Sequence, residues 1–485
     1  MSAIEKLQPR SVWGIFAAMS AIPRGSGNEA AVQAMFKTWA DQRGLAWKED
    51  AVGNLLITIP ASKGMEKAPP VLVQGHVDMV CEKNSGTKHD FAKDPIKLQV
   101  NGDWVTAEGT TLGADNGIGV AMGLAVAEEK GLKHPTVEVL LTVDEERGLT
   151  GAAGVQKGFF TAKRMINLDS EEDAALFIGC SGGQDTILTV KNKKVPLGQG
   201  LAGRKVTVKG LLGGHSGLDI HKNRGNAIKI LTRCLLAAKE QVDFRLVSID
   251  GGSMRNAIPR EAEARVAVKD ADGRLFKKLV DAEAKRILTE ELHGIDDGCQ
   301  VKVGAAKVEH TLGGNCTLRT LHLLDALPNG VLAMSRALPD LVETSSNVGV
   351  VKTDGAQVRI VCCSRSSNGS ALAGLARRHR SLGAMLADRC DVIQEGGYPG
   401  WQPNPDSKLV KATADRYAKV FKRRPELKAI HAGLECGLLT EKYPDLDIVS
   451  FGPDITGAHS PDEQVNVPSV QRVFKLFTAL LADLG

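Results

Sequence analysis

The most constraining feature of the sequence is a short apolar run that ends in a histidine and an aspartate, Val71-Leu-Val-Gln-Gly-His-Val-Asp78. A Val-rich run of this length, preceded by Pro69-Pro70, predicts a buried parallel strand. Residues two apart on a strand share a face, so His76 and Asp78 are expected to emerge together at its carboxyl end, where ligands of open α/β sheets bind. A histidine beside a carboxylate is typical of a metal ligand with its orienting partner, although this stretch alone fits a polar strand end equally well.

Two further strand-like runs also end in acidic residues. Residues 137–143 lead into Asp144-Glu145-Glu146, and residues 164–168 lead into Asp169. A single acidic pair after a strand is usually a solvated loop. Because three strands in one part of the chain each end in acidic or histidine side chains, the runs together predict a functional site.

Two more candidate ligands lie outside these strand ends. Asp115, in Gly113-Ala-Asp-Asn-Gly117, stands at the start of a helix expected over residues 116–129, whose glycines allow a close approach to a sheet. His459 lies in Gly457-Ala-His-Ser-Pro461. Strands that alternate with helices in this way predict an α/β layered domain.

The length of the chain and a change in its texture predict more than one domain. At 485 residues the chain exceeds a single compact core. Charged or turn-rich segments near residue 190 and at Gly396-Gly-Tyr-Pro-Gly-Trp401 are typical of boundaries. We therefore expect one α/β domain made of residues 1–190 and 396–485, interrupted by an inserted α+β domain over residues 191–395. Within the insertion the pattern predicts strands at 204–210, 243–249 and 261–269 and helices at 223–240 and 272–293.

Composition excludes several classes of protein. With 43% apolar and 24% charged residues, the chain is typical of folded soluble proteins. A net charge of +4 predicts neither a nucleic-acid nor a membrane partner, and no apolar run is long enough to span a bilayer. The N-terminal segment lacks the apolar core of a signal peptide, and the nine scattered cysteines contain no Cys-x-x-Cys pair, which is typical of reduced thiols. We therefore expect a cytoplasmic protein.

The candidate ligands, two histidines and several carboxylates, suit a pair of Zn²⁺ ions, and Mn²⁺ or Co²⁺ could take the same ligands. A pair of metals needs one bridging carboxylate, and Asp115 is the natural bridge. Glu145 and Glu146 are adjacent, so on an extended chain their side chains diverge. One can bind a metal while the other acts as general base toward a metal-bound water. The residues alone leave open which glutamate has which role.

These motifs together resemble the di-zinc peptidases that include carnosinases, and within them the bacterial aminoacyl-histidine dipeptidases, also called cytosol non-specific dipeptidases. Two motifs are especially specific, His431-Ala-Gly-Leu-Glu-Cys-Gly437 and Thr456-Gly-Ala-His-Ser-Pro-Asp-Glu-Gln464. The resemblance covers residues 70–180, 205–260 and 396–467. It implies a catalytic domain with a mixed sheet flanked by helices, and it implies that the inserted domain is a lid that also forms a homodimer.

The resemblance also implies two zinc ions, each held by three side chains, with one carboxylate shared. The first set is His76, Asp115 and Asp169, and the second is Asp115, Glu146 and His459. In the same comparison Asp78 orients His76, and Glu145 is the general base.

Four residues from position 215 onward inherit roles in substrate binding from the resemblance. His215, in Gly213-Gly-His-Ser-Gly217, matches a histidine that stabilises the developing oxyanion, although the residue alone would be interpreted as part of a turn. Asn256 and Arg365 match residues that hold the terminal carboxylate of the substrate, a task that suits a bidentate guanidinium. Gly433, in the His431 motif, is expected to line the substrate site.

The function expected from these observations is hydrolysis of unblocked dipeptides, including those of the form Xaa-His. An alternative is a related amidohydrolase that acts on N-acyl amino acids or ureido compounds. A metal-binding dimerisation scaffold without catalysis is a third hypothesis, but it would be expected to lack Glu145 or Asp78, and both are present.

Other motif matches fail. Gly214-His-Ser-Gly-Leu218 is not a Gly-x-Ser-x-Gly nucleophile elbow, and no His-Glu-x-x-His occurs, which argues against serine hydrolases and thermolysin-like zinc sites. The glycines from 117 to 123 have the wrong spacing for a dinucleotide fingerprint. The remaining histidines are expected at the surface: His89, His134, His221, His293, His310, His322 and His379.

Overall fold

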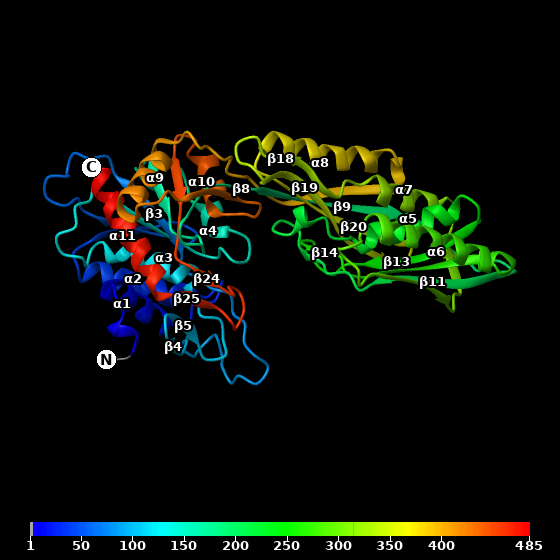
Figure 1. Ribbon diagram of the computed structural model, residues 1–485, viewed down its shortest axis with the longest axis horizontal. Coiled ribbons are helices and arrows are strands. Elements are labelled where there is room, and N and C mark those ends of the chain that lie inside the picture. Colours follow the sequence, from blue (N-terminus) through cyan, green and yellow to red (C-terminus); the bar gives the residue numbers. More distant parts are fainter. Residues whose placement is uncertain (1–2, 314) are drawn as a thin grey trace. The chain divides into compact units, whose positions relative to one another are not determined.

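The computed structural model describes residues 3–313 and 315–485, which form two compact units (Figure 1). The first unit contains the chain up to Cys180 together with residues 401–429 and 434–485, and the second contains residues 181–400 and 430–433. The sequence analysis expected the domain to change at residues 190 and 396 and left residues 430–433 in the first domain. The structure holds 430–433 in the second unit, because the Ser181 amide donates to the carbonyls of Ile430 and Ala432 at 3.1 and 3.0 Å.

The first unit is built on an eight-stranded mixed sheet with the strand order β1-β2-β6-β3-β7-β23-β8-β22. β3 (Val71–His76) runs parallel to β6 (Val137–Thr142) and β7 (Arg164–Asn167), so their carboxyl ends meet at one edge. β3 and β6 are buried along their whole length, which explains their unbroken apolar runs. The three predicted strands are thus confirmed. The other strands of the sheet are β1 (Ala46–Glu49), β2 (Leu55–Ile59), β8 (Ala175–Cys180), β22 (Glu426–Ile430) and β23 (Asp447–Ser450).

The helix that begins next to the site packs closely on this sheet. α3 (Ala114–Ala125) contacts β3, and α1 (Arg10–Ser20) contacts α3. A Cβ at Gly123 would lie 3.1 Å from Val73 Cγ1, and a Cβ at Gly119 would overlap the carbonyl oxygen of Leu168. The close approach to the sheet, expected at Gly117 and Gly119, is therefore confirmed at Gly119 and also occurs at Gly123. A Cβ at Gly117 would instead meet the side chains of Phe16 in α1 and Arg24.

The remaining elements of the first unit complete its layers. α9 (Lys408–Phe421) contacts both β23 and α11 (Val467–Asp483). A separate four-stranded sheet has the order β24-β25-β5-β4. Its strands are β4 (Leu98–Asn101), β5 (Trp104–Ala107), β24 (Ile455–Thr456) and β25 (Gln464–Asn466), and the other helices are α2 (Ala30–Asp41), α4 (Thr150–Gly154) and α10 (Glu435–Lys442).

The second unit contains a nine-stranded sheet with the order β16-β11-β15-β13-β19-β20-β9-β21, and β18 pairs with β19. Its helix α5 (Ala227–Lys239) begins later than the expected residue 223, because the Asn226 side chain accepts hydrogen bonds from the amides of Ile228 and Lys229 and so caps the helix there. The strands of the large sheet are β9 (Gly182–Lys191), β11 (Leu201–Lys209), β13 (Phe244–Gly251), β15 (Ala262–Lys269), β16 (Gln300–Ala305), β18 (Gly330–Met334), β19 (Val342–Asp354), β20 (Gln357–Ser366) and β21 (Cys390–Tyr398). The other elements are α6 (Gly273–Glu290), α7 (Cys316–Ala326), α8 (Gly369–Ala384), and the short pairs β10 (Lys194–Pro196) with β17 (His310–Leu312) and β12 (Gly214–His215) with β14 (Ala257–Ile258).

Two minor expectations from the sequence have different outcomes. All nine cysteines lie in the described ranges and are free, and all except Cys81 are buried, as predicted for reduced thiols. The prediction of surface histidines is wrong for His134 and His379, which are buried. His379 lies three and four residues after Ala376 and Leu375 on α8, which puts it on the buried face of that helix.

Within residues 3–313 and 315–485, no helix combines the length and apolar character needed to cross a membrane.

The two helical glycines Gly119 and Gly14 are expected to respond oppositely to alanine. Gly119→Ala should lower the free energy of unfolding by about 1–3 kcal/mol, because the new methyl group overlaps the Leu168 carbonyl. Gly14→Ala, in α1, meets no atom within 4 Å and should stabilise the protein by up to about 1 kcal/mol through helix propensity. Thermal unfolding followed by circular dichroism measures both, and equal shifts in the two variants would contradict the close packing of α3.

Candidate metal centre

Asp115 lies between two histidines, and each of its carboxylate oxygens faces a different one. Its Oδ1 is 3.1 Å from His76 Nε2, and its Oδ2 is 3.2 Å from His459 Nε2. Each histidine nitrogen meets one further carboxylate, since His76 Nε2 is 3.4 Å from Asp169 Oδ1 and His459 Nε2 is 3.1 Å from Glu146 Oε2. The structure therefore brings together two sets of three side chains that share Asp115.

The local fold explains why these residues meet. His76 is the last residue of β3, Asp169 follows the end of β7, and Glu146 follows β6, so the parallel strands bring three side chains to one edge. Asp115 arrives from the first turn of α3. His459 comes from the loop between β24 and β25, where it has a left-handed backbone with φ of 63°.

Asp78 connects His76 to the two glutamates. Its Oδ1 lies 3.3 Å from His76 Nδ1, on the side of the ring away from Asp115. Its carboxylate also accepts hydrogen bonds from the backbone amides of Glu145 and Glu146, at 3.1 and 3.2 Å, and from the Ser26 hydroxyl at 2.7 Å. Burial alone would raise the pKa of Asp78, but His76 and these hydrogen bonds lower it to about 2. Asp78 is thus an ionised acceptor that orients both the imidazole and the loop after β6.

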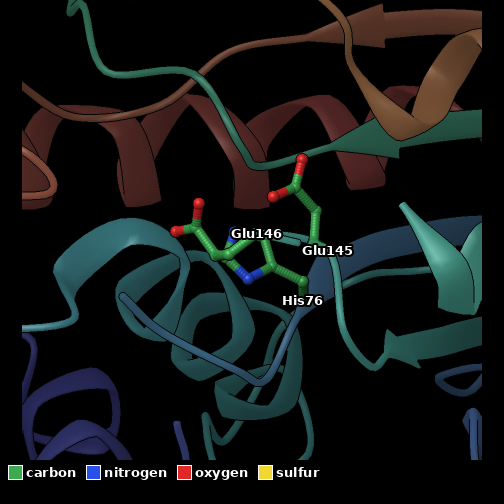
Figure 2. A group of neighbouring side chains, drawn as sticks. All are labelled: His76, Glu145 and Glu146. Carbon is green, nitrogen blue, oxygen red and sulfur yellow. The ribbon is translucent and has the colours of Figure 1, made fainter. Parts of the chain in front are cut away.

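The side chains of Glu145 and Glu146 diverge, as expected for adjacent residues (Figure 2). Both approach His76 closely enough to share a ligand group with it. Burial and the neighbouring carboxylates raise the pKa of Glu145 well above its ordinary value, although His76 opposes the shift. Glu145 is therefore a buried carboxyl group beside the two sets of side chains, and its affinity for a proton is raised.

The donor set fits a pair of divalent cations. Two buried carboxylate oxygens of the set, Glu146 Oε1 and Asp169 Oδ1, make no hydrogen bond within the part of the chain that the structure describes. Burial, together with the charges of Asp115 and Glu146, raises the pKa of Asp169 to about 7. Buried carboxylates that repel one another are stabilised by a shared cation, and imidazole with carboxylate ligands suits Zn²⁺ and similar metals.

Glu463 holds the start of α3 in place, a role that the sequence analysis missed. Its buried carboxylate accepts hydrogen bonds from the amides of Leu112, Gly113 and Ala114 at 2.7 to 2.9 Å, and from the amide of Asp115 at 3.3 Å. A carboxylate at a helix N-terminus also interacts favourably with the helix dipole. The residue lies in the specific Thr456–Gln464 motif, but nothing in the sequence pairs it with a helix so far away.

Arg24 is a second supporting residue without a sequence signal. It is 1% exposed, and it donates to the carbonyls of Val77, Asp78 and Gly113 at 2.5 to 3.0 Å. Its guanidinium thus joins the loop after β3 to the loop before α3. Burial lowers its pKa to about 10, which leaves it charged at neutral pH.

The sequence-predicted residues of the second unit form a separate cluster. His215 Nε2 lies 3.5 Å from an Arg365 nitrogen, and Arg365 donates to the Tyr398 hydroxyl at 3.1 Å. Gly433 packs against the Tyr398 ring, where a Cβ would come within 2.9 Å. Asn256 is joined through its backbone, since its carbonyl accepts from the Ser216 amide at 2.8 Å. These residues are therefore neighbours within the unit.

A buried histidine that was not predicted completes this cluster. His431 is 6% exposed and lies 2.7 Å from the Ser345 hydroxyl. Burial and the charge of Arg365 lower the pKa of His431 to about 3 and that of His215 to about 4. Both imidazoles are therefore neutral at pH 7, and the fixed positive charge of the cluster is that of Arg365.

The replacement Glu463→Ala is expected to destabilise α3 and to weaken cation binding at Asp115. It leaves four buried amides without their acceptor, which should lower the free energy of unfolding by about 3 kcal/mol. Urea unfolding and competition with a chelator for Zn²⁺ measure the two effects. The control is Asp462→Ala, which removes the neighbouring exposed carboxylate. Identical behaviour of the two variants would show that the cap is dispensable.

Comparisons with known proteins agree with this geometry. The profile of the family described as Peptidase family M20/M25/M40 matches residues 72–483. The chain is 42% identical over 485 residues to a protein of Escherichia coli (strain K12) named cytosol non-specific dipeptidase. The alignment covers 100% of this chain and 99% of that protein.

Solved structures show the same relation. The aminoacylhistidine dipeptidase of Vibrio alginolyticus matches with a TM-score of 0.92 and 41% identity, over 99% of this chain and 98% of that one. The aminopeptidase PepT of Bacillus cereus matches with a TM-score of 0.58 and 16% identity, over 99% of both chains, and so shares the fold. By its family match over most of its length and its full-length relative, the chain belongs to Peptidase family M20/M25/M40.

Proposed function

We propose that the protein is a metal-dependent dipeptidase that hydrolyses unblocked dipeptides, including Xaa-His, with two divalent cations, most simply Zn²⁺. The observation that carries the proposal is the position of Asp115, whose two oxygens face His76 and His459 while Asp169 and Glu146 complete the two sets. The full-length similarity to proteins named cytosol non-specific dipeptidase and aminoacylhistidine dipeptidase supports this substrate class.

In this mechanism the protein positions a water and moves its proton. When bound, the two cations supply the Lewis acidity that makes a water nucleophilic at neutral pH and polarises a peptide carbonyl. Glu145, which approaches His76 beside the two sets, takes the proton of the attacking water and returns it to the leaving nitrogen. Asp78 holds the His76 imidazole in orientation and fixes the loop that carries Glu145.

For the second unit we propose two substrate-binding roles. His215, which is neutral at pH 7, donates a hydrogen bond to the oxyanion of the tetrahedral intermediate. Arg365 binds the terminal carboxylate of the dipeptide, with Asn256 and Gly433 beside it. A buried guanidinium next to two neutral imidazoles is suited to an anionic partner.

We further propose that the protein is cytoplasmic and acts as a homodimer through the second unit. The Escherichia coli relative is named cytosol non-specific dipeptidase, which supports the location. The support for the dimer is the resemblance of the inserted domain to dimer-forming lids. The small net charge of +4 gives no reason to expect a nucleic-acid or membrane partner.

The decisive experiment compares the wild type with Glu145→Gln on a dipeptide panel. The variant should lose roughly 10²–10⁴-fold in kcat, because the general base is gone, while it keeps both cations. Hydrolysis is measured with Ala-His, Gly-His and Leu-Leu, and metal content is determined on the same samples. N-acetylated and C-amidated dipeptides test whether both free ends are needed.

Glu441→Gln, an exposed glutamate on α10, is the matched control and should behave as the wild type. A wild type that holds two cations but cleaves only N-acyl or ureido substrates would replace the dipeptidase proposal by that amidohydrolase activity. A wild type that binds no cation would refute the metal centre itself.

The neutral state of His215 is directly testable by NMR. Its folded pKa of about 4 lies below the ordinary 6.5, so the folded protein binds fewer protons than the unfolded chain between these values. This group therefore stabilises the fold above pH 6.5, and its contribution is lost as the pH falls from about 6.5 to about 4.

Arg365→Gln should raise the pKa of His215, because it removes the neighbouring positive charge, whereas Arg255→Gln should not. The imidazole resonances are followed in ¹⁵N-histidine-labelled protein. A His215 that titrates near 6.5 in the wild type would contradict the proposed neutral donor.

A further inference from the structure

A chain of buried polar side chains lies across the carboxyl ends of β3, β6 and β7, and the mechanism above does not use it. Glu435, on the first turn of α10, accepts hydrogen bonds from the Gln74 amide at 2.5 Å and from the Thr142 hydroxyl at 2.6 Å. Gln74 in turn accepts from the Asn167 amide at 2.6 Å, and Asn167 accepts from the Ser450 hydroxyl at 2.5 Å. All five residues are at most 1% exposed.

The chain of amides has one direction, and the groups at its two ends impose it: the Glu435 carboxylate accepts from Gln74, and the Asp169 backbone amide donates to Asn167. Oε2 of Glu435 accepts from both Gln74 and Thr142, so the NH₂ group of Gln74 must face it. Burial raises the pKa of Glu435 to about 7, and a proton on the unpaired Oε1 would leave Oε2 an acceptor. The Gln74 carbonyl then faces the NH₂ group of Asn167, and the Asn167 carbonyl faces onward. A neutral amide at position 435 could present either an oxygen or an NH₂ group to Gln74, so the order of the two amides would then be fixed only from the Asn167 end, by the 3.3 Å hydrogen bond from the Asp169 amide.

This order reaches two of the proposed cation ligands. Gln74 is two residues before His76 on β3, and Asn167 is two residues before Asp169 at the end of β7. The Asn167 carbonyl also accepts from the backbone amide of Asp169, at 3.3 Å. The hydrogen bond between Gln74 and Asn167 therefore links the ends of the two strands that carry His76 and Asp169.

We propose that Glu435 is a positioning residue that fixes the Gln74 end of this chain and thereby holds His76 and Asp169 where a shared cation needs them. The inference rests on the proposed function, since it takes His76 and Asp169 to be cation ligands. One Glu435 oxygen, Oε1, is buried and makes no hydrogen bond within the described residues, so the binding of Gln74 and Thr142 at Oε2 is the role that the contacts assign to this carboxylate.

The test exchanges the donor and the acceptor. Glu435→Gln and Gln74→Glu should each weaken binding of one of the two cations by roughly 10–100-fold, as expected when the support of a ligand is lost. The double variant E435Q/Q74E restores one carboxylate facing one amide. It should therefore bind the cation at least about tenfold more tightly than either single variant. Zn²⁺ affinity is measured by chelator competition, and kcat and KM for Ala-His are measured on the zinc-loaded proteins.

Two control variants separate positioning from general stability. Glu138→Gln changes a second buried glutamate, which lies near the start of β6 and accepts hydrogen bonds from the amides of Thr161 and Ala162. This variant should leave both cation affinities unchanged. Thr142→Val removes a donor to Glu435 but keeps the direction of the amides, so its effect should be smaller than that of Glu435→Gln.

The outcomes distinguish this inference from the proposed function. A wild type without two bound cations refutes the proposed function. A wild type with two cations, whose affinities are unchanged in Glu435→Gln, overturns the positioning role. A double variant that recovers no cation affinity also overturns the positioning role. The same holds if Glu138→Gln loses as much cation affinity as Glu435→Gln. If Glu435→Gln does not fold, Gln74→Glu and the double variant decide the question by the same comparison.

Discussion

The structure of the first unit depends on the burial of several carboxylates within a few ångströms of one another. Asp115, Asp169 and Glu146 converge on two histidine nitrogens, and burial with mutual repulsion raises the pKa of Asp169 to about 7. Such a cluster is unfavourable unless cations or hydrogen-bond donors compensate it. The imidazoles of His76 and His459 and the expected pair of cations provide that compensation at the centre.

The residues around the cluster provide further compensation, through hydrogen-bond donors and acceptors whose positions are fixed. Asp78 accepts hydrogen bonds from two backbone amides of the loop after β6, and Glu463 accepts hydrogen bonds from four amides at the start of α3. Arg24 joins the loops on either side. Beneath them Gln74 and Asn167 connect neighbouring strands. Because each donor belongs to the backbone or to a buried side chain, the proposed ligands are held in place by contacts within the protein itself.

Much of the fold and of the site could be predicted, but with a clear limit. The apolar runs correctly predicted β3, β6 and β7, and the glycines of α3 correctly predicted its close packing, because both are local patterns. The prediction of a surface residue was wrong for His379, because a polar residue was judged by its type rather than by its place on the apolar face of α8. The roles of the site residues, including Glu145 as base, stay predictions that the geometry supports.

The sequence by itself determined which side chains stand at the strand ends, since His76 ends an apolar run and Glu146 and Asp169 each follow one, and such runs mark buried strands. Only the tertiary structure decided which distant groups complete them. His459 and Asp115 are 344 residues apart, and Glu435 and Gln74 are 361 residues apart. No local period or spacing encodes a contact of that separation, because the packing of the whole sheet brings the two segments together.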